Sequence, residues 1–256
     1  MADTITTTLT MNVETRNRAT VFATHEEAGT GYVQPPVAPQ YSYAALQGAM
    51  SALDILDTFK HSVVPSQHTE LNEVVGENVL LSYLREDNLL FAFTHGTVYG
   101  FKASYTDQDS GNGDEMLEWS EILAVGRNTT TGRNLALLYA CSAFGGGSSM
   151  ASALGITGPG RGVAGFNVVV WSAWSLSTQV DVLLSNHSTL VMVRLVAGDT
   201  LQEAVDHANN VYKPVDPFGT HTDMIVGGDS FTRTHFVYAE DSAKLNQWRN
   251  AWFALP

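Results

Sequence analysis

Short apolar runs alternate with stretches of helical periodicity along this chain. The runs of the first kind are short and of β-branched, aliphatic or aromatic character, which is typical of buried strands. Strands are predicted at 19–24, 62–64, 89–94, 134–140, 166–174 and 234–238, with a hairpin around 99–105. Helices are predicted at 43–59, 70–84, 116–125, 150–154, 178–196 and 200–212, the last capped by Thr200. Strands that alternate with helices predict an α/β fold with a mostly parallel sheet, covered by helices on both faces as a three-layer αβα sandwich.

Two of the apolar runs end in a reactive side chain beside glycine. Asn88-Leu-Leu-Phe-Ala-Phe-Thr leads into His95 and Gly96, and Asn134-Leu-Ala-Leu-Leu-Tyr-Ala leads into Cys141, which three glycines follow shortly. Functional groups of parallel sheets collect just beyond the carboxyl ends of the strands. If these two strands are neighbours, His95 and Cys141 face each other across that edge.

This pair has the chemistry of a nucleophile and its base. A cysteine attacks as the thiolate, and a neighbouring imidazole accepts its proton or stabilises its charge. The glycine after His95 leaves a backbone amide uncovered, so the amides of Gly96 and Cys141 together predict an oxyanion hole. The alternative interpretation is an inert cysteine in the core and an incidental His-Gly pair.

Composition and charge narrow the functional classes. The chain has 256 residues, enough for one large domain, and 44% of them are hydrophobic, as in globular proteins. Its formal net charge of −13 gives no attraction to nucleic acid or to anionic membranes. A single cysteine excludes an internal disulfide and a cysteine-based structural zinc site. No signal peptide and no apolar stretch of spanning length is evident, so a cytoplasmic protein without membrane contact is expected.

The order of these motifs resembles that of the caspase-like cysteine peptidases, and in particular of the CHAT and separase domains. The similarity rests on strand-His95-Gly96 followed by strand-Ala140-Cys141, and on a third segment, 165–181, with a glycine, an apolar strand, tryptophans and an aspartate at a helix start. It covers about residues 88–210. Residues 1–256 are accordingly expected to form a single caspase-like domain, with 213–256 as an extension packed on the core.

The resemblance implies roles for individual residues. His95 is the base or proton donor, Cys141 is the nucleophile, and the Gly96 and Cys141 amides form the oxyanion hole. It also implies that an extended peptide pairs with the edge at 171–174, and that an acidic residue helps to bind a basic P1 side chain. The expected substrate-binding residues are Ser172, Trp174 and Asp181.

Each substrate-binding residue also has a structural interpretation. An aspartate in the first turn of a helix is favoured by the helix dipole alone, which would explain Asp181 without a pocket. Trp174 would equally suit the core. The residue before Ala140 is Tyr139, where many of the similar peptidases have Asp or Gln.

Two further segments carry weaker signals. Asp107, Asp109 and Asp114 lie in an acidic loop that resembles a fragment of a calcium loop, but it lacks the helical frame and the spaced glutamate, so a solvated loop is the preferred interpretation. No other metal and no cofactor is expected. The glycines at 145–147 resemble a phosphate-binding turn without its Lys-Ser/Thr.

The sequence therefore predicts a cysteine endopeptidase that cleaves a protein or peptide after a basic residue. No sensor repeat is present, so regulation would come from a separate protein subunit or from proteolysis. Two alternatives stay open. One is a caspase fold that has lost catalysis and binds a protein partner, and the other is a flavodoxin-like nucleotide-binding protein that uses the glycines at 145–147.

Overall fold

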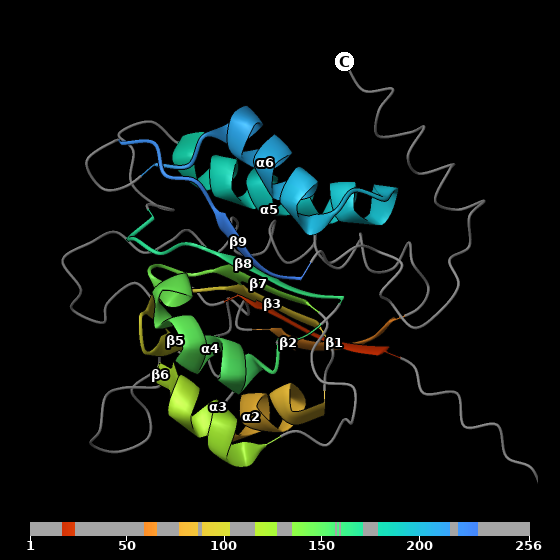
Figure 1. Cartoon of the computed structure of the whole chain (residues 1–256), viewed down its shortest axis with the longest axis vertical. Helices are drawn as coiled ribbons and strands as arrows, with labels where there is room; N and C mark the ends of the chain where they lie inside the picture. Colours follow the sequence, from red (N-terminus) through yellow and green to blue (C-terminus); the bar gives the residue numbers. More distant parts are fainter. Residues whose placement is uncertain are drawn as a thin grey trace, which may run out of the picture.

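A mixed six-stranded sheet forms the centre of the molecule (Figure 1). The computed structural model describes residues 17–23, 59–65, 77–86, 89–102, 116–126, 135–156, 158, 160–170, 179–215 and 220–229. The strands of this sheet, in spatial order, are β2 (Phe59–Pro65), β1 (Asn17–Ala23), β3 (Leu89–Phe93), β7 (Leu135–Tyr139), β8 (Arg161–Gly165) and β9 (Ile225–Asp229).

Neighbouring strands from β2 to β8 run parallel, and β9 alone pairs antiparallel with β8. The strand order reverses at β1, because β2 lies on one side of it and β3 on the other. In open α/β sheets, ligands bind outside the carboxyl ends of the strands near such a reversal. All five residues of β3 and of β7 are buried, as continuous apolar strands require.

Helices cover both faces of the sheet, which confirms the predicted three-layer αβα sandwich. On one face lie α5 (Gln179–Ala197) and α6 (Leu201–Tyr212), and on the other lie α2 (Glu77–Glu86), α3 (Trp119–Val125) and α4 (Gly147–Leu154) (Figure 1). Each face has its own cluster of buried apolar side chains. Leu137 packs toward α5 and α6 and Leu138 toward α3 and α4, because successive residues of a strand point to opposite faces.

A small antiparallel sheet follows β3 directly. It consists of β4 (Gly96–Thr97), β5 (Gly100–Lys102) and β6 (Met116–Glu118). The predicted hairpin is thus confirmed for the described residues up to 102. The predicted helix at 116–125 is wrong in its first three residues, because their backbone pairs with β5. The helix begins only at Trp119, where Glu118 and Glu121 form a capping box.

The strand predicted at 166–174 is wrong over its described part. The strand that pairs with β7 is β8, at 161–165, where no strand was predicted. Small residues suit it, because a Cβ on Gly165 would already lie 3.3 Å from the Cβ atoms of Leu138 and Phe144. The apolar residues that suggested a strand are partly at the surface, where Val168 and Val169 are 41% and 48% exposed.

The remaining predictions fall into two groups. The strands around 19–24, 62–64 and 89–94, the helical stretch at 150–154 and the helices at 178–196 and 200–212 are confirmed, including the cap at Thr200. The predicted helix at 70–84 is confirmed from residue 77, the first described one. The helix predicted at 43–59 lies outside the described residues up to 58, and it is wrong at Phe59, which begins β2. The strand predicted at 234–238 lies outside the described residues. Strand β9 was not predicted, because Gly227 and Gly228 interrupt its apolar pattern.

Candidate active site

The register of β3 and β7 brings the two predicted reactive residues to one edge of the sheet. Phe93 and Tyr139 are the last paired residues of these parallel neighbours. The pairing continues in a hydrogen bond of 3.0 Å from the Thr94 amide to the Tyr139 carbonyl. His95 and Cys141 each come two residues after the last pair, so both lie at the carboxyl edge of the sheet, with the His95 side chain exposed.

Gly96 lies directly against the backbone at Cys141. A Cβ at this position would be 2.8 Å from the Ala140 Cβ and 2.9 Å from the Cys141 carbonyl oxygen. Distances this short exclude any side chain without a shift of the backbone. The glycine after His95 is therefore required by the close approach of the two strand ends, and it brings its own amide to the same edge as the Cys141 amide.

The chain after β8 holds the turn that carries Cys141. The Cys141 thiol donates a hydrogen bond of 3.2 Å to the Val170 carbonyl. The Ser142 amide donates to the Val168 carbonyl at 2.9 Å, and the Phe144 amide donates to the Phe166 carbonyl at 3.1 Å. We call residues 166–170 the clamp segment. Through these three bonds it fixes the backbone on the far side of Cys141 from His95.

Burial keeps the thiol protonated in this conformation. Desolvation raises the pKa of the half-buried Cys141, and this effect outweighs hydrogen bonds with the backbone of Val170 and of Cys141 itself, which lower the pKa. A neutral thiol is a poor nucleophile. For this cysteine to react at neutral pH, a neighbouring base has to remove its proton as the attack proceeds.

The glycines at 145–147 have a packing role. They end the short 3-10 turn η1 (Ala143–Gly146) and begin α4. A Cβ on Gly146 would overlap the indole nitrogen of Trp119 and lie 2.9 Å from the Val98 carbonyl, which accepts a 3.0 Å hydrogen bond from that indole. Close packing thus explains Gly146, whereas a Cβ on Gly147 would meet no atom within 4 Å.

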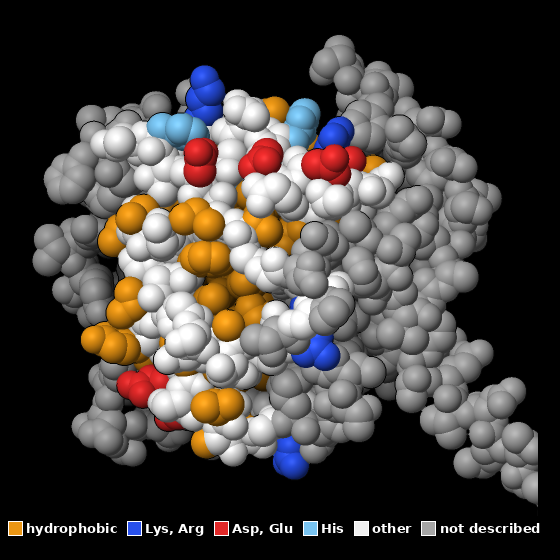
Figure 2. Space-filling view, viewed as in Figure 1, with side chains coloured by type: hydrophobic (Ala, Val, Ile, Leu, Met, Phe, Trp, Pro, Cys, Tyr) orange, Lys and Arg blue, Asp and Glu red, His pale blue; other side chains and the backbone are white. Residues whose placement is uncertain are grey.

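Two apolar side chains are exposed beside the turn. Val98 is 40% exposed and Tyr99 is 73% exposed, both in the tight connection between β4 and β5. The Val98 side chain would lie 3.0 Å from a Cβ on Gly145, and the Asn167 carbonyl of the clamp segment 3.9 Å from it. The β4–β5 turn and the clamp segment therefore flank the same glycine. Figure 2 shows hydrophobic side chains across the middle of the face that it draws.

The predicted substrate-binding residues are only partly placed. Asp181 lies in the first turn of α5, and its side chain belongs to the part of the chain that is not described. Ser172 and Trp174 lie outside the described residues. The peptide-binding edge predicted at 171–174 lies outside the described residues as well. The strand before it, β8, pairs along its whole length with β9.

The acidic loop with Asp107, Asp109 and Asp114 also lies outside the described residues. Within the described ranges, no group of three or more His, Cys, Asp or Glu side chains could hold a metal ion.

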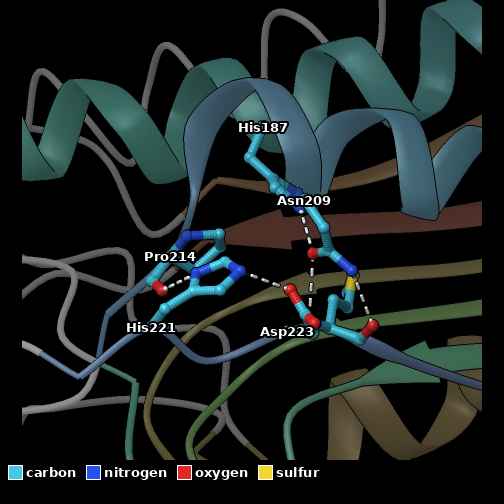
Figure 3. Close-up of polar contacts among 6 residues, drawn as sticks. His187, Asn209, Pro214, His221 and Asp223 are labelled. Atoms are coloured by element: carbon cyan, nitrogen blue, oxygen red, sulfur yellow. Dashed lines mark hydrogen bonds and ion pairs between the residues drawn. The ribbon is translucent and has the colours of Figure 1, made fainter.

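A buried polar cluster, which the sequence analysis missed, lies beneath the turn. The Tyr139 hydroxyl is 2.8 Å from Nδ1 of His187 on α5, and Nε2 of His187 is 3.0 Å from Oδ1 of Asn209 on α6. Asn209 in turn bonds both backbone groups of Met224, donating from Nδ2 at 3.0 Å and accepting at Oδ1 at 3.0 Å. Figure 3 shows His187 directed from its helix toward Asn209. The cluster joins β7, α5, α6 and the chain entering β9.

The bonds to Met224 determine the direction of every proton in the cluster. Since the Met224 amide donates to Asn209 Oδ1, that atom is an acceptor, and His187 Nε2 has to carry hydrogen. Neutral His187 then accepts at Nδ1 from the Tyr139 hydroxyl. Desolvation lowers the pKa of His187 to about 4, against the opposing influence of Asn209 and Asp223, and burial raises the pKa of Tyr139. Both groups are therefore neutral at physiological pH.

One sequence signal could have found this cluster. His187 stands three residues after Leu184 and four before Val191, so it lies on the apolar stripe of α5. Asn209 occupies the corresponding stripe of α6, beside Val205 and Ala208. A polar residue on an apolar stripe is expected to have a buried hydrogen-bond partner.

A second histidine contact lies outside the core. His221 is 3.0 Å from the Pro214 carbonyl through Nδ1 and 2.8 Å from Asp223 Oδ1 through Nε2, in the connection between α6 and β9 (Figure 3). Both His221 and Asp223 are exposed. This pair braces a surface turn, and it is separate from the turn at Cys141.

Comparisons with known proteins assign no family. No protein-family model matches this chain, and a search of curated proteins finds no match either. Among the helices of the described part, none has the length and apolar character needed to cross a membrane.

Proposed function

We propose that this protein is a cysteine endopeptidase of the caspase-like type, with His95 and Cys141 as its catalytic pair. The observation that carries the proposal is the register of β3 and β7, which ends two residues before His95 and Cys141 at one edge of the sheet. The approach of Gly96 to Cys141 supports it, because two backbone amides belong to the same edge.

The proposed reaction has two halves. The Cys141 thiol transfers its proton to the His95 imidazole while Sγ attacks the carbonyl carbon of the scissile bond. Amides of Gly96 and Cys141 stabilise the negative oxygen of the tetrahedral intermediate. The imidazolium then protonates the leaving amine, and a thioester remains on Cys141. Water, deprotonated by His95, hydrolyses the thioester and restores the free thiol.

The raised pKa of Cys141 places a requirement on this mechanism. Because burial favours the neutral thiol, deprotonation accompanies substrate attack and does not precede it. The thiol also has to leave the Val170 carbonyl, its hydrogen-bond acceptor, to reach a substrate carbon. His95 is therefore assigned the role of general base in the first step.

The substrate is proposed to be an extended segment of a protein with Arg or Lys at P1. Support comes from the exposed apolar side chains of Val98, Tyr99 and Val168 beside the turn, from the net charge of −13, and from the place of Asp181 in the first turn of α5. The proposal includes action in the cytoplasm and control by a separate protein subunit.

Replacement of either catalytic residue tests the proposal directly. Cys141→Ala and His95→Ala are each expected to lower kcat/KM for peptide cleavage by at least about a thousandfold, since no other group replaces the nucleophile or the base. The assay compares fluorogenic peptides with Arg, Lys or Asp at P1. A matched control is His207→Ala, at an exposed histidine of α6, with unchanged cleavage. Full activity in Cys141→Ala would refute the mechanism.

A non-catalytic protein-binding module is the second candidate. The observation that favours it is the burial of the Cys141 thiol and its hydrogen bond to Val170. The two candidates differ in their response to a peptide probe with a thiol-reactive group. Because the chain contains one cysteine, any label reports on Cys141. Labelling of Cys141 that is lost in His95→Ala supports the peptidase. No labelling of the wild-type protein supports the binding module.

A further inference from the structure

We propose that Tyr139 is a positioning residue for the pair His95–Cys141, and that His187 and Asn209 hold it in place for this purpose. This inference rests on the proposed function, and it assigns a role to the buried cluster that the catalytic mechanism does not use.

Tyr139 contacts the strand end that leads to each reactive residue. It stands two residues before Cys141 in β7, and both side chains belong to the face covered by α5 and α6. Its ring stacks on that of Phe93 with centroids 6.0 Å apart, and Phe93 stands two residues before His95 in β3. A tilt of the Tyr139 ring would therefore disturb both strand ends together.

The same ring supports the clamp segment. Phe166, its first residue, packs edge-on against Tyr139 at 6.2 Å and also lies 6.5 Å from the His187 ring. The carbonyls of this segment accept the hydrogen bonds of the Cys141 thiol and of the Ser142 amide. The position of the thiol thus depends on Tyr139 from two directions, along β7 and through Phe166.

The hydrogen bonds of the cluster fix the ring in one orientation. Apolar neighbours alone would allow the Tyr139 ring to slide, whereas the 2.8 Å bond to His187 gives it a defined end point. His187 is held by Asn209, and Asn209 by both backbone groups of Met224. Because His187 and Asn209 are buried, water cannot replace these bonds, and the chain of contacts is well suited to transmit position.

The test removes the hydroxyl and then the group that it leaves unpaired. Tyr139→Phe keeps the ring but leaves His187 Nδ1 without a donor, so both stability and position suffer. In the double variant Tyr139→Phe/His187→Leu, both polar partners are gone, and stability is expected to recover toward that of the wild type. Positioning does not recover. We expect kcat to stay roughly tenfold to a hundredfold below wild type in both variants, with KM nearly unchanged.

A second measurement does not depend on catalysis. Iodoacetamide alkylates the single cysteine of the folded chain, and its rate across the pH range of thiol ionisation reports on the burial of Cys141. Both variants are expected to react at least about threefold faster than wild type, because the thiol loosens from Val170. Thr200→Ala, which destabilises α6 at its exposed cap without touching the cluster, is the control, with wild-type kcat and alkylation rate.

Three results would overturn the inference. They are wild-type kcat in Tyr139→Phe, recovery of kcat together with stability in the double variant, and an unchanged alkylation rate in both. If the wild-type protein cleaves no peptide, the proposed function fails while the alkylation rates still decide the role of Tyr139.

Discussion

The two faces of the central sheet differ in the polar groups that they bury. The face under α2, α3 and α4 is packed by apolar side chains, and its buried indole, Trp119, donates to a backbone carbonyl. The face under α5 and α6 contains apolar side chains of similar size together with a buried chain of side-chain hydrogen bonds. Of the four described polar side chains that are buried, the three outside β1 lie on α5 and α6: His187, Ser188 and Asn209.

This difference suggests separate roles for the two faces, one in the stability of the fold and one in the placement of side chains. Apolar packing is tolerant of small shifts, because its energy depends on buried area and on the filling of space. A hydrogen bond in the core also fixes a direction, and a buried donor or acceptor without a partner lowers the stability of the fold. The face with the polar cluster is also the one toward which Cys141 packs. We infer that the first face mainly stabilises the fold, and that the second also determines where the reactive side chains lie.

Two adjacent residues of β7 provide a matched pair of variants that tests this difference between the faces. Leu137 and Leu138 are both fully buried and point to opposite faces. Leu137→Ala and Leu138→Ala are each expected to lower the free energy of unfolding by about 3 kcal/mol, measured by urea denaturation, since each leaves a cavity. Only Leu137→Ala, beneath Tyr139, is expected to lower kcat of the folded protein as well. Equal loss of kcat in both variants would contradict the division of roles.

Acid should destabilise the protein through His187 of the polar face. The pKa of His187 falls from 6.5 to about 4 on folding, so between these values the unfolded chain binds a proton that the folded protein excludes. Stability from this group is complete above pH 6.5 and is lost as the pH falls toward 4, by about 3 kcal/mol in total. Urea denaturation across this range measures the loss.

The variants distinguish the two faces in this experiment. His187→Leu should remove this part of the acid sensitivity, so its unfolding free energy falls less steeply with pH than that of the wild type. Leu138→Ala, on the other face, should lower the unfolding free energy by the same amount at each pH. If the unfolding free energy of His187→Leu fell with pH as steeply as that of Leu138→Ala, His187 would not be a source of the acid sensitivity.

The smallest expected effect concerns the outer end of α6. Thr200 accepts a hydrogen bond of 3.2 Å from the Glu203 amide, and the Glu203 carboxylate accepts from the Thr200 amide at 2.9 Å. Thr200→Ala is expected to lower the free energy of unfolding by about 1 kcal/mol. Thr200→Ser, which keeps the hydroxyl, is the matched control and should stay close to wild type. Equal loss in both would remove the cap as the cause.

The sequence was most informative where one local rule decided the structure. Continuous apolar runs predicted β3 and β7, whose residues are all buried. The side chains that follow these runs predicted a candidate site at the carboxyl edge of the sheet. The cap at Thr200 and the apolar stripe of α6 predicted that helix. These features depend on a few neighbouring residues, so the pattern alone sufficed.

Prediction failed where a distant partner decided the structure. Strand β8 is formed by small residues because Leu138 and Phe144 occupy the space above Gly165, and no pattern within 161–165 indicates that requirement. Strand β9 pairs with β8 despite its glycines. The polar cluster was missed for the same reason, because His187, Asn209 and Tyr139 are far apart in the chain and meet only in the folded sheet.

The polar cluster is completed late during synthesis, because it includes the chain that enters β9. Both His95 and Cys141 have been made when the chain has reached residue 141, but Asn209 and the Met224 backbone that fixes its amide come more than sixty residues later. A nascent chain therefore contains both proposed catalytic residues long before it contains the groups that hold Tyr139. If Tyr139 acts as proposed, these two residues are brought into position only once β9 has been added.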